Sequence, residues 1–575
     1  MNNMTEHIAA ALAGHMEGVD AQQIEGMLEL PADPGHGDLS LPCFKLSKQL
    51  RRPPQQIADK LAGILKDEFI VEARAVSGYL NIYLNRERFA VKLLEEMEGM
   101  GAAYGSADAG NGQTVVIDYS SPNIAKPFHI AHLRSTVIGQ SLYRILAFRG
   151  YTCVGVNHLG DWGTQFGKLL AAYEHWGNED RIASGGMEEL LRLYVRFHEE
   201  AESAPELEEE ARAWFVRLEK GEPAVRDRWK WFVEISLEAF QSIYELLGIR
   251  FDAYTGESFY NEKLNAVLQQ LKKQGLLEED DGAQVVRLDE YSMPPVLMLK
   301  SDGSSLYPTR DITAAIYRKH RYNSSKLIYV TDYSQSLHFQ QWFKVIERMG
   351  CDWADELVHV PFGRISFQGE GLSTRKGNVV RLEDVLRQAV HKTETIMAAR
   401  DPQMTDERRI AARAVGVGAV IFHDLSRSRM HDVAFDWEHV LNFEGETGPY
   451  VQYTFARACR LLQRAGNERR GSADEQVKSN EEPAAHLTDE SAWVLLKLLQ
   501  RFPERIAQAE HKLEPSIVSR TLIELAQAFN HFYHHCPVFT ATGAVREARI
   551  RLVRATARTL KTGLYLIGLA SPKEI

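Results

Sequence analysis

Cysteine is scarce in this chain, and no two cysteines have the spacing of a metal-binding knuckle. The 575 residues contain five cysteines: Cys43, Cys153, Cys351, Cys459 and Cys536. They lie far apart and form no CxxC pair, which argues against a structural zinc site and against a disulfide scaffold. Scattered thiols in odd number are typical of a reducing compartment, so we expect a cytoplasmic protein.

The chain also lacks long apolar runs and an excess of positive charge. No stretch of 18 or more apolar residues occurs, so we expect no membrane span. The first 30 residues have no basic start and are interrupted by Glu6, His7 and Glu17, which is not the pattern of a secretory signal. The formal net charge of −11 disfavours general coating of nucleic acid but allows a local basic surface.

The chain contains enough hydrophobic residues to form the cores of several domains. Hydrophobic residues make up 44% and charged residues 25%, as in ordinary globular proteins. At roughly 150 residues per domain, the length suggests about three to four domains. Residues 1–105 are expected to form a small α+β unit. Its predicted elements are a helix over 5–30, a loop over 31–42, two strands within 70–84 around Ser77-Gly78, and a linker over 105–112.

The middle of the chain predicts an α/β fold with a doubly wound, Rossmann-type parallel sheet. A buried strand (114–120), a helix (130–148) and a second strand (151–161) form a βαβ pattern. Similar strands are expected at 326–330 and 356–361. We assign 106–385 to this domain, with a charged helical insertion at about 178–247. Beyond 386 helical patterns dominate, and we assign 386–575 to an all-α helical bundle, with a polar surface loop or disordered segment at 465–485.

The chemistry is expected where the first strand ends. Ligands of open parallel sheets bind beyond the carboxyl ends of the strands. There, His129 and His132 lie three apart at the start of a helix, on one face, where free N–H groups and the helix dipole favour phosphate. A lone histidine is more often structural, but the pair at a strand-to-helix turn favours a phosphate site. The glycine-rich segment 369–380 could close on the same phosphates through Ser373, Thr374, Arg375 and Lys376.

Together these segments resemble the paired signatures of class I aminoacyl-tRNA synthetases, and further motifs resemble the arginyl-tRNA synthetases. The motifs are SPNIAKPFHIAHLRSTVIG (121–139), NHLGDWGTQFG (157–167), DGSSLYPTRDITAAIYR (302–318), STRKGNVVRLEDVL (373–386), ETGPYVQY (446–453) and AFNHFYHHCPV (528–538). The likeness covers nearly the whole chain. It implies an N-terminal tRNA-contacting domain at 1–105, the catalytic domain at 106–385 and a helical anticodon-binding domain at 386–575.

The resemblance implies an ATP-binding signature and a set of catalytic residues. The signature comprises Pro122, Asn123, Ile124, Ala125, Lys126, Pro127, Phe128, His129, Ile130, Ala131 and His132. The implied catalytic residues are Lys126, His129, His132, Ser373, Thr374, Arg375 and Lys376.

Two positions depart from the class pattern. The first signature usually reads His-x-Gly-His, and the third position here is Ala131. The second usually begins Lys-Met-Ser, and here it reads Gly371-Leu372-Ser373. In arginyl enzymes a lysine just before the first signature is thought to substitute for a missing one, and Lys126 matches it. These departures motivate an alternative hypothesis, a catalytically weakened paralogue that binds tRNA or regulates.

An arginine substrate needs planar anionic acceptors for its guanidinium group. The resemblance supplies Asp118 and Asp311 for this role, and these two acids argue against a class I synthetase for another amino acid. Tyr307 and Asp311 lie four apart and would share one face of a helix. Gln335 and Asn123 match contacts to the amino-acid part of the substrate. Analogues such as lysine would leave buried carboxylates imperfectly paired, so no editing site is expected.

The last helix is expected to be basic on one face and apolar on the other, the apolar stripe running from Ile550 to Leu564. A solvated surface helix would show the same pattern, but the resemblance favours a role in binding tRNA. The candidate tRNA contacts are Asn81, Tyr450, Tyr453, Phe532, Arg551, Arg554, Arg558 and Lys561. For the aromatic rings core packing is an open alternative, and for Asn81 the alternative is a role in the neighbouring turn.

The resemblance implies a two-step ligation of L-arginine to tRNA(Arg) through arginyl-adenylate, with release of AMP and pyrophosphate. It implies no covalently attached side chain, so catalysis would rest on positioning and on charge stabilisation. ATP would be the substrate together with Mg²⁺, which phosphates and water would hold. We expect no structural zinc, no membrane partner and a monomer.

Overall fold

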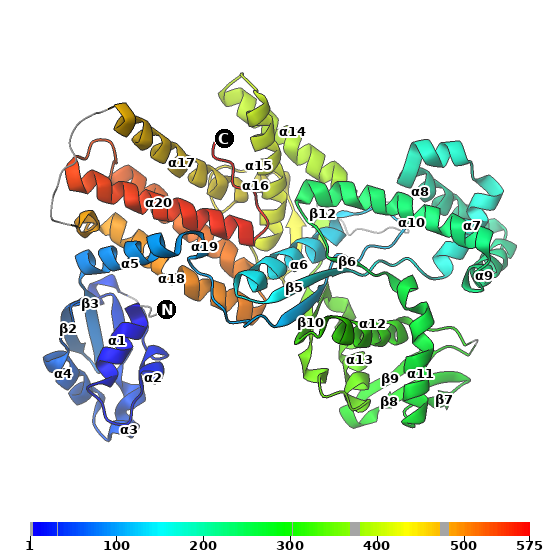
Figure 1. Ribbon diagram of the computed structural model, residues 1–575, viewed down its shortest axis with the longest axis horizontal. Helices are drawn as coiled ribbons and strands as arrows, with labels where there is room; N and C mark the ends of the chain where they lie inside the picture. Colours follow the sequence, from blue (N-terminus) through cyan, green and yellow to red (C-terminus); the bar gives the residue numbers. More distant parts are fainter. Residues whose placement is uncertain (1–3, 32, 302, 368–379, 472–481) are drawn as a thin grey trace. The chain divides into compact units, whose positions relative to one another are not determined.

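The computed structural model describes residues 4–31, 33–301, 303–367, 380–471 and 482–575 (Figure 1). The chain divides into two compact units. The first unit contains residues up to Tyr104 together with 457–503 and 524–560. The second contains 105–456, 504–523 and 561–575.

The first unit begins with a three-stranded antiparallel sheet in the order β1-β3-β2. The hairpin predicted within 70–84 is confirmed, because β2 (Ile70–Val76) and β3 (Tyr79–Leu84) meet at Ser77-Gly78. Both turn residues have left-handed backbone angles, with φ of 50° and 82°, as a tight two-residue hairpin requires. The loop prediction for 31–42 was wrong at its end, where β1 (Leu39–Pro42) adds an edge strand to β3.

The single helix predicted over 5–30 is two helices. α1 (Met4–Ala13) ends before a turn in which Gly18 has a φ of 75°. α2 (Ala21–Glu25) begins where the Asp20 carboxylate accepts a hydrogen bond from the Gln23 N–H at 2.7 Å. Apolar spacing alone carried the pattern across this break, because a glycine turn followed by an N-cap interrupts a helix without disturbing its apolar stripe. The remaining helices of this part are α3 (Ser47–Leu50), α4 (Pro54–Ile64) and α5 (Arg86–Met100).

The second unit is built on a five-stranded parallel sheet in the order β11-β10-β4-β5-β6. The predicted doubly wound fold is confirmed. The strand bounds are β4 (Thr114–Asp118), β5 (Thr152–Asn157), β6 (Ala253–Tyr254), β10 (Lys326–Asp332) and β11 (Leu357–Phe362). The predicted helix appears as α6 (Ile130–Phe148). The chain extends the sheet to one side of β4 through β5 and to the other through β10, so the switch point lies at the ends of β4 and β10.

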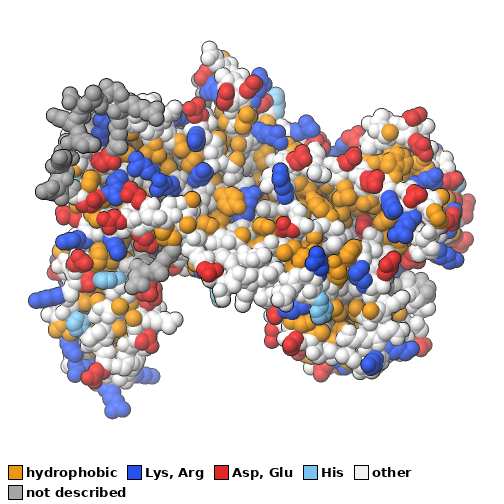
Figure 2. Space-filling model, viewed as in Figure 1, with side chains coloured by type: hydrophobic (Ala, Val, Ile, Leu, Met, Phe, Trp, Pro, Cys, Tyr) orange, Lys and Arg blue, Asp and Glu red, His pale blue; other side chains and the backbone are white. Residues whose placement is uncertain are grey.

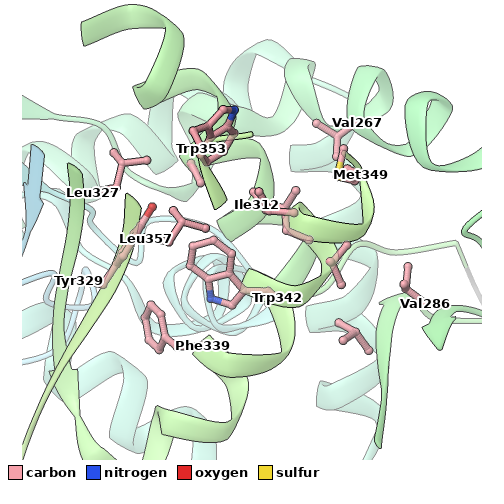
Figure 3. Close-up of a cluster of buried hydrophobic side chains, with 14 of the residues drawn as sticks. Val267, Val286, Ile312, Leu327, Tyr329, Phe339, Trp342, Met349, Trp353 and Leu357 are labelled. Atoms are coloured by element: carbon pink, nitrogen blue, oxygen red, sulfur yellow. The ribbon is translucent and has the colours of Figure 1, made fainter. Parts of the chain in front are cut away.

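A buried aromatic cluster fixes one face of this sheet (Figure 3). α12 (Tyr307–Tyr322) and α13 (Ser336–Arg348) contribute Ile312 and Trp342, both fully buried. The ring centre of Tyr329, in β10, lies 5.2 Å from that of Trp342, which it meets edge-on. It lies 5.4 Å from the ring centre of Phe339. Because α12 and α13 are held by this cluster, the residues at their N-terminal ends have fixed positions at the carboxyl edge of the sheet.

Further elements flank the sheet. Helices are dense over 178–247, where the sequence predicted them. The helices of this stretch are α8 (Glu179–Ser203), α9 (Glu206–Glu219) and α10 (Pro223–Leu247); α7 (Thr164–Trp176) precedes it and α11 (Leu264–Lys273) follows it. The sequence did not indicate the antiparallel sheet of β7 (Glu278–Asp280), β8 (Ala283–Leu288) and β9 (Met293–Leu299), nor the parallel pair β12 (Ile365–Phe367) and β13 (Val433–Phe435). On the face shown in Figure 2, acidic and basic side chains are interspersed over α7–α10.

The rest of the chain is helical, as predicted, apart from β13. Its helices are α14 (Leu382–Arg400), α15 (Asp406–Leu425), α16 (Trp437–Val440), α17 (Gly448–Gly471), α18 (Glu490–Lys512), α19 (Ser516–His535) and α20 (Gly543–Leu566). The apolar stripe predicted on α20 is buried, from Ile550 at 4% exposed to Leu564 at 0%. Among the described residues, no helix is long and apolar enough to cross a membrane.

Candidate functional site

A cavity of about 580 Å³ opens at the switch point of the parallel sheet. The ends of β4 and β10 form its floor, and the chain after β4, the start of α12 and the start of α13 form its walls. Its lining is rich in polar side chains and includes His129, Ala131 and His132 of the predicted ATP signature together with all five residues predicted to bind arginine. These are Asp118, Asn123, Tyr307, Asp311 and Gln335.

The chain between β4 and α6 carries the predicted ATP signature in an unusual backbone conformation. Ser120, Ser121 and Ala125 all have left-handed φ angles, of 71°, 46° and 59°. Such angles are rare for residues other than glycine and persist only where the surroundings hold them. Lys126 follows directly, with its Nζ atom 5.7 Å from the centre of the Tyr194 ring.

His129 and His132 stack face to face at the first turn of α6, with ring centres 3.8 Å apart. Nδ1 of His132 accepts a hydrogen bond from the backbone N–H of His129 at 3.2 Å. Burial, with the neighbouring His129 and Lys126, holds the pKa of His132 well below its usual range, so the ring is neutral. A neutral ring whose Nδ1 accepts carries its proton on Nε2, which leaves an N–H donor for a ligand.

The His129 ring is also neutral. Burial, and then the Lys126 charge, lower its pKa to about 4. Its Nδ1 atom is buried and has no hydrogen-bond partner among the residues that the structure describes. A buried polar atom without a partner is costly, and binding a ligand would remove that cost. Both histidines can therefore serve as neutral hydrogen-bonding groups beside the helix N-terminus.

The backbone around 380–382 runs beside the first signature. The Ile130 N–H donates to the Val380 carbonyl at 3.1 Å, and the Leu382 N–H donates to the Phe128 carbonyl at 2.9 Å. This pairing joins the end of the second predicted motif to the first. Ser373, Thr374, Arg375 and Lys376 themselves lie outside the described residues.

A fully buried arginine ties α6 to the segment that leads into the second motif. Nη1 of Arg134 donates to the carbonyls of Gly363 at 2.6 Å and His431 at 2.8 Å. Its Nε atom lies 3.0 Å from the Asp424 carboxylate. A second cavity of about 410 Å³ lies here, and it shares Ala131, Asp332 and Phe362 with the first. Ala131, where the class pattern has glycine, therefore borders both cavities.

Asp118 does not present a free charge to the cavity. Its Oδ2 atom accepts a hydrogen bond from Nη1 of Arg318 at 2.7 Å, and its Oδ1 atom accepts one from the Ser121 hydroxyl at 2.8 Å. Both charged side chains are buried. An internal arginine thus occupies the place that the resemblance assigned to the substrate, so Asp118 is poorly suited to bind a second guanidinium group.

Sequence reasoning missed a different carboxylate, Glu257, which lines the same cavity as Asp311. Burial raises the pKa of Glu257 to about 8, opposed by the Arg310 charge and reinforced by Asp311 and Asp161. The Asp161 carboxylate accepts two hydrogen bonds from Ser258, at 2.8 Å from the N–H and 2.6 Å from the hydroxyl, and so fixes the segment that carries Glu257. The only signal in the sequence was an acidic residue after a short strand, which is too common to single out.

The other predicted substrate contacts surround the opening of the cavity. Nε2 of His338 and Oδ2 of Asp311 lie 2.6 Å apart. Tyr307, 66% exposed, begins α12, and the exposed Gln335 precedes α13. Asn123 pairs with Gly160 in a short parallel bridge, in which the Ile124 N–H donates to the Gly160 carbonyl. A Cβ atom on Gly160 would lie 2.1 Å from the Asn123 Oδ1, so glycine is needed for this close approach.

Comparison with known proteins identifies the family. Three family models match in succession: the arginyl tRNA synthetase N-terminal domain at residues 2–84, the class I (R) tRNA synthetase catalytic domain at 99–437, and the DALR anticodon-binding domain at 451–575. An arginine–tRNA ligase of Alkaliphilus metalliredigens is 46% identical over 577 residues and covers all of both chains. The chain belongs to the class I arginyl-tRNA synthetases. An arginine–tRNA ligase of Clostridioides difficile is also 46% identical, over 576 residues.

Solved structures of the family have the same fold. The arginyl-tRNA synthetase of Thermus thermophilus, 26% identical, matches with a TM-score of 0.81 and covers 100% of this chain and 99% of its own. That of Plasmodium falciparum, 22% identical, matches over the whole of both chains with a TM-score of 0.78 and shows the fold alone.

Several candidate tRNA contacts of this synthetase have internal roles. Asn81 is 4% exposed, and its side-chain oxygen accepts the Ser40 hydroxyl at 2.8 Å. Phe532 is fully buried. The Arg551 guanidinium pairs with the Glu98 carboxylate at 2.9 Å and with Glu482. Core packing or internal pairing therefore accounts for these three, since the sequence did not show which way each side chain faces.

The remaining candidates face outward to differing degrees. Arg558 and Lys561 on α20 are exposed, whereas Arg554 is half-buried. Tyr450 and Tyr453, on the first turns of α17, are half-buried. Within the described residues, no group of three or more His, Cys, Asp or Glu side chains is arranged to hold a metal ion.

Proposed function

We propose that this chain activates L-arginine with ATP to form arginyl-adenylate and transfers the arginyl group to the 3′ end of tRNA(Arg). The single observation that carries this is the cavity at the switch point, which is lined both by the neutral imidazole groups of the ATP signature and by carboxylates. The first set suits phosphates, and the second suits a guanidinium group.

The arginine side chain is assigned to Glu257 and Asp311, with Tyr307 beside them. Both carboxylates line the cavity, and each is half-buried, which strengthens their interaction with a cation that displaces water. The guanidinium group stays charged at any assay pH and can form two parallel hydrogen bonds to each acid. Asp118 then takes an indirect role, because its pairing with Arg318 shapes the floor beneath the substrate. Asn123 and Gln335 are assigned to the amino-acid backbone of the substrate.

The triphosphate is assigned to His129, His132 and Lys126. The Nδ1 of His129, without a partner among the described residues, and the Nε2–H of His132 belong to rings that stack at the first turn of α6, where the N-terminal end of the helix adds positive potential. The adjoining cavity of about 410 Å³ is assigned to the adenosine moiety, which Ala131 would border. Mg²⁺ would enter with ATP and be held by phosphate oxygens and water. Ser373, Thr374, Arg375 and Lys376 remain proposed partners of the phosphates.

The tRNA is assigned to the flanking parts of the chain. Arg558 and Lys561 are the exposed cations of α20 that could hold phosphates, with Arg554 beside them. Tyr450 and Tyr453 are the aromatic residues proposed to stack on unpaired bases. We further propose that the N-terminal part meets the tRNA, and that the enzyme acts as a monomer in the cytoplasm.

The deciding experiment is aminoacylation of total tRNA with each of the 20 amino acids. Charging with arginine alone supports the proposal. Glu257→Gln and Asp311→Asn should each raise the KM for arginine by 10-fold or more, as expected for loss of a charged hydrogen bond, whereas Asp281→Asn, at an exposed turn, should not. Bound tRNA without any charging would instead support the weakened paralogue.

A further inference from the structure

Two of the three left-handed residues between β4 and α6, Ser120 and Ala125, are hydrogen-bonded to a single helix. α10 presents Ser236, Phe240 and Tyr244, spaced four apart and therefore on one face. All three are buried, with exposures of 0%, 1% and 2%. None of them lines the cavity of about 580 Å³. They contact the segment without lining that cavity.

Two of the three contacts hold the ends of the segment. The Tyr244 hydroxyl lies 2.8 Å from the Ser120 hydroxyl and accepts a hydrogen bond from the Asn157 amide at 2.9 Å. It thereby joins the ends of the neighbouring strands β4 and β5. The Phe240 ring meets Phe128 edge-on at 5.6 Å, just before the signature histidines.

The third contact reaches the strained residue in the middle. The backbone N–H of Ala125 donates to the Ser236 hydroxyl at 3.1 Å. The same hydroxyl donates its proton to the Phe232 carbonyl at 2.8 Å. Because this bond fixes the orientation of the hydroxyl group, a lone pair of its oxygen is directed toward the Ala125 N–H. Ala125 has a φ of 59° and is 5% exposed. Without the hydroxyl its N–H would be left without a partner among the described residues, and the left-handed angle would lose the restraint that this hydrogen bond provides.

We propose that Ser236 is a positioning residue for the ATP step: it holds Ala125 in the left-handed conformation and thereby sets the direction of Lys126. The chain direction after residue 125 follows from that angle, and Lys126 is the next residue. The inference rests on the proposed function, in which Lys126 meets the triphosphate. It assigns to Ser236 of α10, outside both signature motifs, an influence on ATP that acts through Ala125 and Lys126, and none on the arginine pocket.

The test compares Ser236→Ala with Ser242→Ala, because Ser242 is an exposed serine of the same helix. Steady-state aminoacylation is measured with tRNA saturating, varying ATP and arginine in turn. Ser236→Ala is expected to lower kcat/KM for ATP about five- to tenfold, the effect of one lost hydrogen bond, and to leave the KM for arginine unchanged. Ser242→Ala is expected to match the wild-type enzyme in both.

A rescue separates positioning from a loss of stability. Glycine adopts positive φ without strain, so Ala125→Gly in the Ser236→Ala background is expected to recover at least half of the lost kcat/KM for ATP. Ser236→Cys, which keeps the size and a weak acceptor, should give an intermediate rate and serves in place of Ser236→Ala if that variant precipitates. Melting curves accompany each variant.

Two results would overturn the inference. One is a Ser236→Ala enzyme with wild-type kinetics toward ATP. The other is an equal loss toward ATP and arginine that Ala125→Gly does not restore, which would indicate a general structural role. If the wild-type enzyme and Ser242→Ala both fail to charge arginine, the proposed function fails and the inference with it; wild-type charging beside an unaffected Ser236→Ala enzyme overturns the inference alone.

Discussion

Nη1 of Arg318 lies 2.7 Å from Oδ2 of Asp118, and the two side chains form a buried ion pair beneath the proposed arginine site. Its members come from the end of β4 and from α12. The Nε and Nη2 atoms of Arg318 have no hydrogen-bond partner within the described part of the chain. The pair is therefore a costly arrangement that depends on Asp118 keeping its charge.

Asp118→Asn should destabilise the enzyme strongly. Removing one partner leaves a buried cation uncompensated, which costs about 3 kcal/mol or more. In the second unit, which is larger than a typical domain, that corresponds to a fall of roughly 4 °C or more in melting temperature. Differential scanning calorimetry measures it, with Glu383→Gln as the control, because Glu383 and Arg387 form an exposed pair. Equal melting temperatures for the two variants would show that the buried pair has little energetic weight.

The affinity for arginine should rise with pH through the titration of Glu257. Its pKa of about 8 means that at pH 7 the carboxyl group is mostly protonated in the free enzyme. Between pH 7 and pH 9 the ionised fraction grows about tenfold, and the KM for arginine should fall by a similar factor. In Glu257→Gln this slope should disappear, and the ratio of the two profiles removes any contribution from the titration of the substrate.

The same raised pKa has a consequence for stability. The folded state binds this proton more tightly than the unfolded state, so without arginine this group's stabilising contribution is full below about pH 4.5 and is lost as pH rises toward about 8. Melting temperatures of Glu257→Gln across this range should decline less steeply than those of the wild-type enzyme. A parallel decline would contradict the assigned pKa.

His132 should matter as a donor and not as an acid. Its pKa lies well below the usual range. Titration of His132 should therefore cause no change in kcat between pH 6 and pH 8. His132→Asn can keep an acceptor near the Nδ1 position but loses the Nε2–H, and kcat should fall about 100-fold. His320→Asn, at an exposed position of α12, is the control. A His132→Asn enzyme within threefold of the wild type would remove His132 from the phosphate site.

Gly160→Ala should impair substrate binding without loosening the fold. The added Cβ atom would lie 2.1 Å from the Asn123 Oδ1, and the Asn123 side chain can relieve the clash only by turning away. We expect the KM for arginine to rise severalfold while the melting temperature stays within about 2 °C of the wild type. Gly63→Ala, where nothing lies within 4 Å, is the comparison. A large fall in melting temperature would mean that the backbone moves instead of the side chain.

Much of the catalytic fold could be predicted because its signals are local. The strand at 114–120, the helix at 130–148 and the hairpin within 70–84 follow from apolar period and turn residues, and the structure has them within about two residues. The helix over 5–30 failed because an apolar stripe continues across a glycine turn. The short β12 and β13 gave no signal, since three residues cannot establish a period.

The site was harder to predict because its electrostatics depend on contacts between distant residues. His129 and His132 could be recognised from their spacing at a strand-to-helix turn. The pairing of Asp118 with Arg318 joins positions 200 apart, and neither residue reveals it. Glu257 became a candidate only when its burial beside Asp311 was visible, and Asn81 and Phe532 lost their assigned contacts for the same reason. Composition and spacing report residue types, whereas burial decides what each carboxylate, amide or ring is free to bind.

The distance along the chain between the walls of the cavity bears on how the enzyme is made. Asp118, Glu257, Asp311 and His338 enclose one site but leave the ribosome at widely separated times. A nascent chain that ends before residue 338 contains the β4 end with its acidic side chain but lacks α13 and the aromatic cluster that fixes it. Arginine can therefore stabilise the second unit only after α13 has been made, and cannot serve as a template for the earlier stages of synthesis.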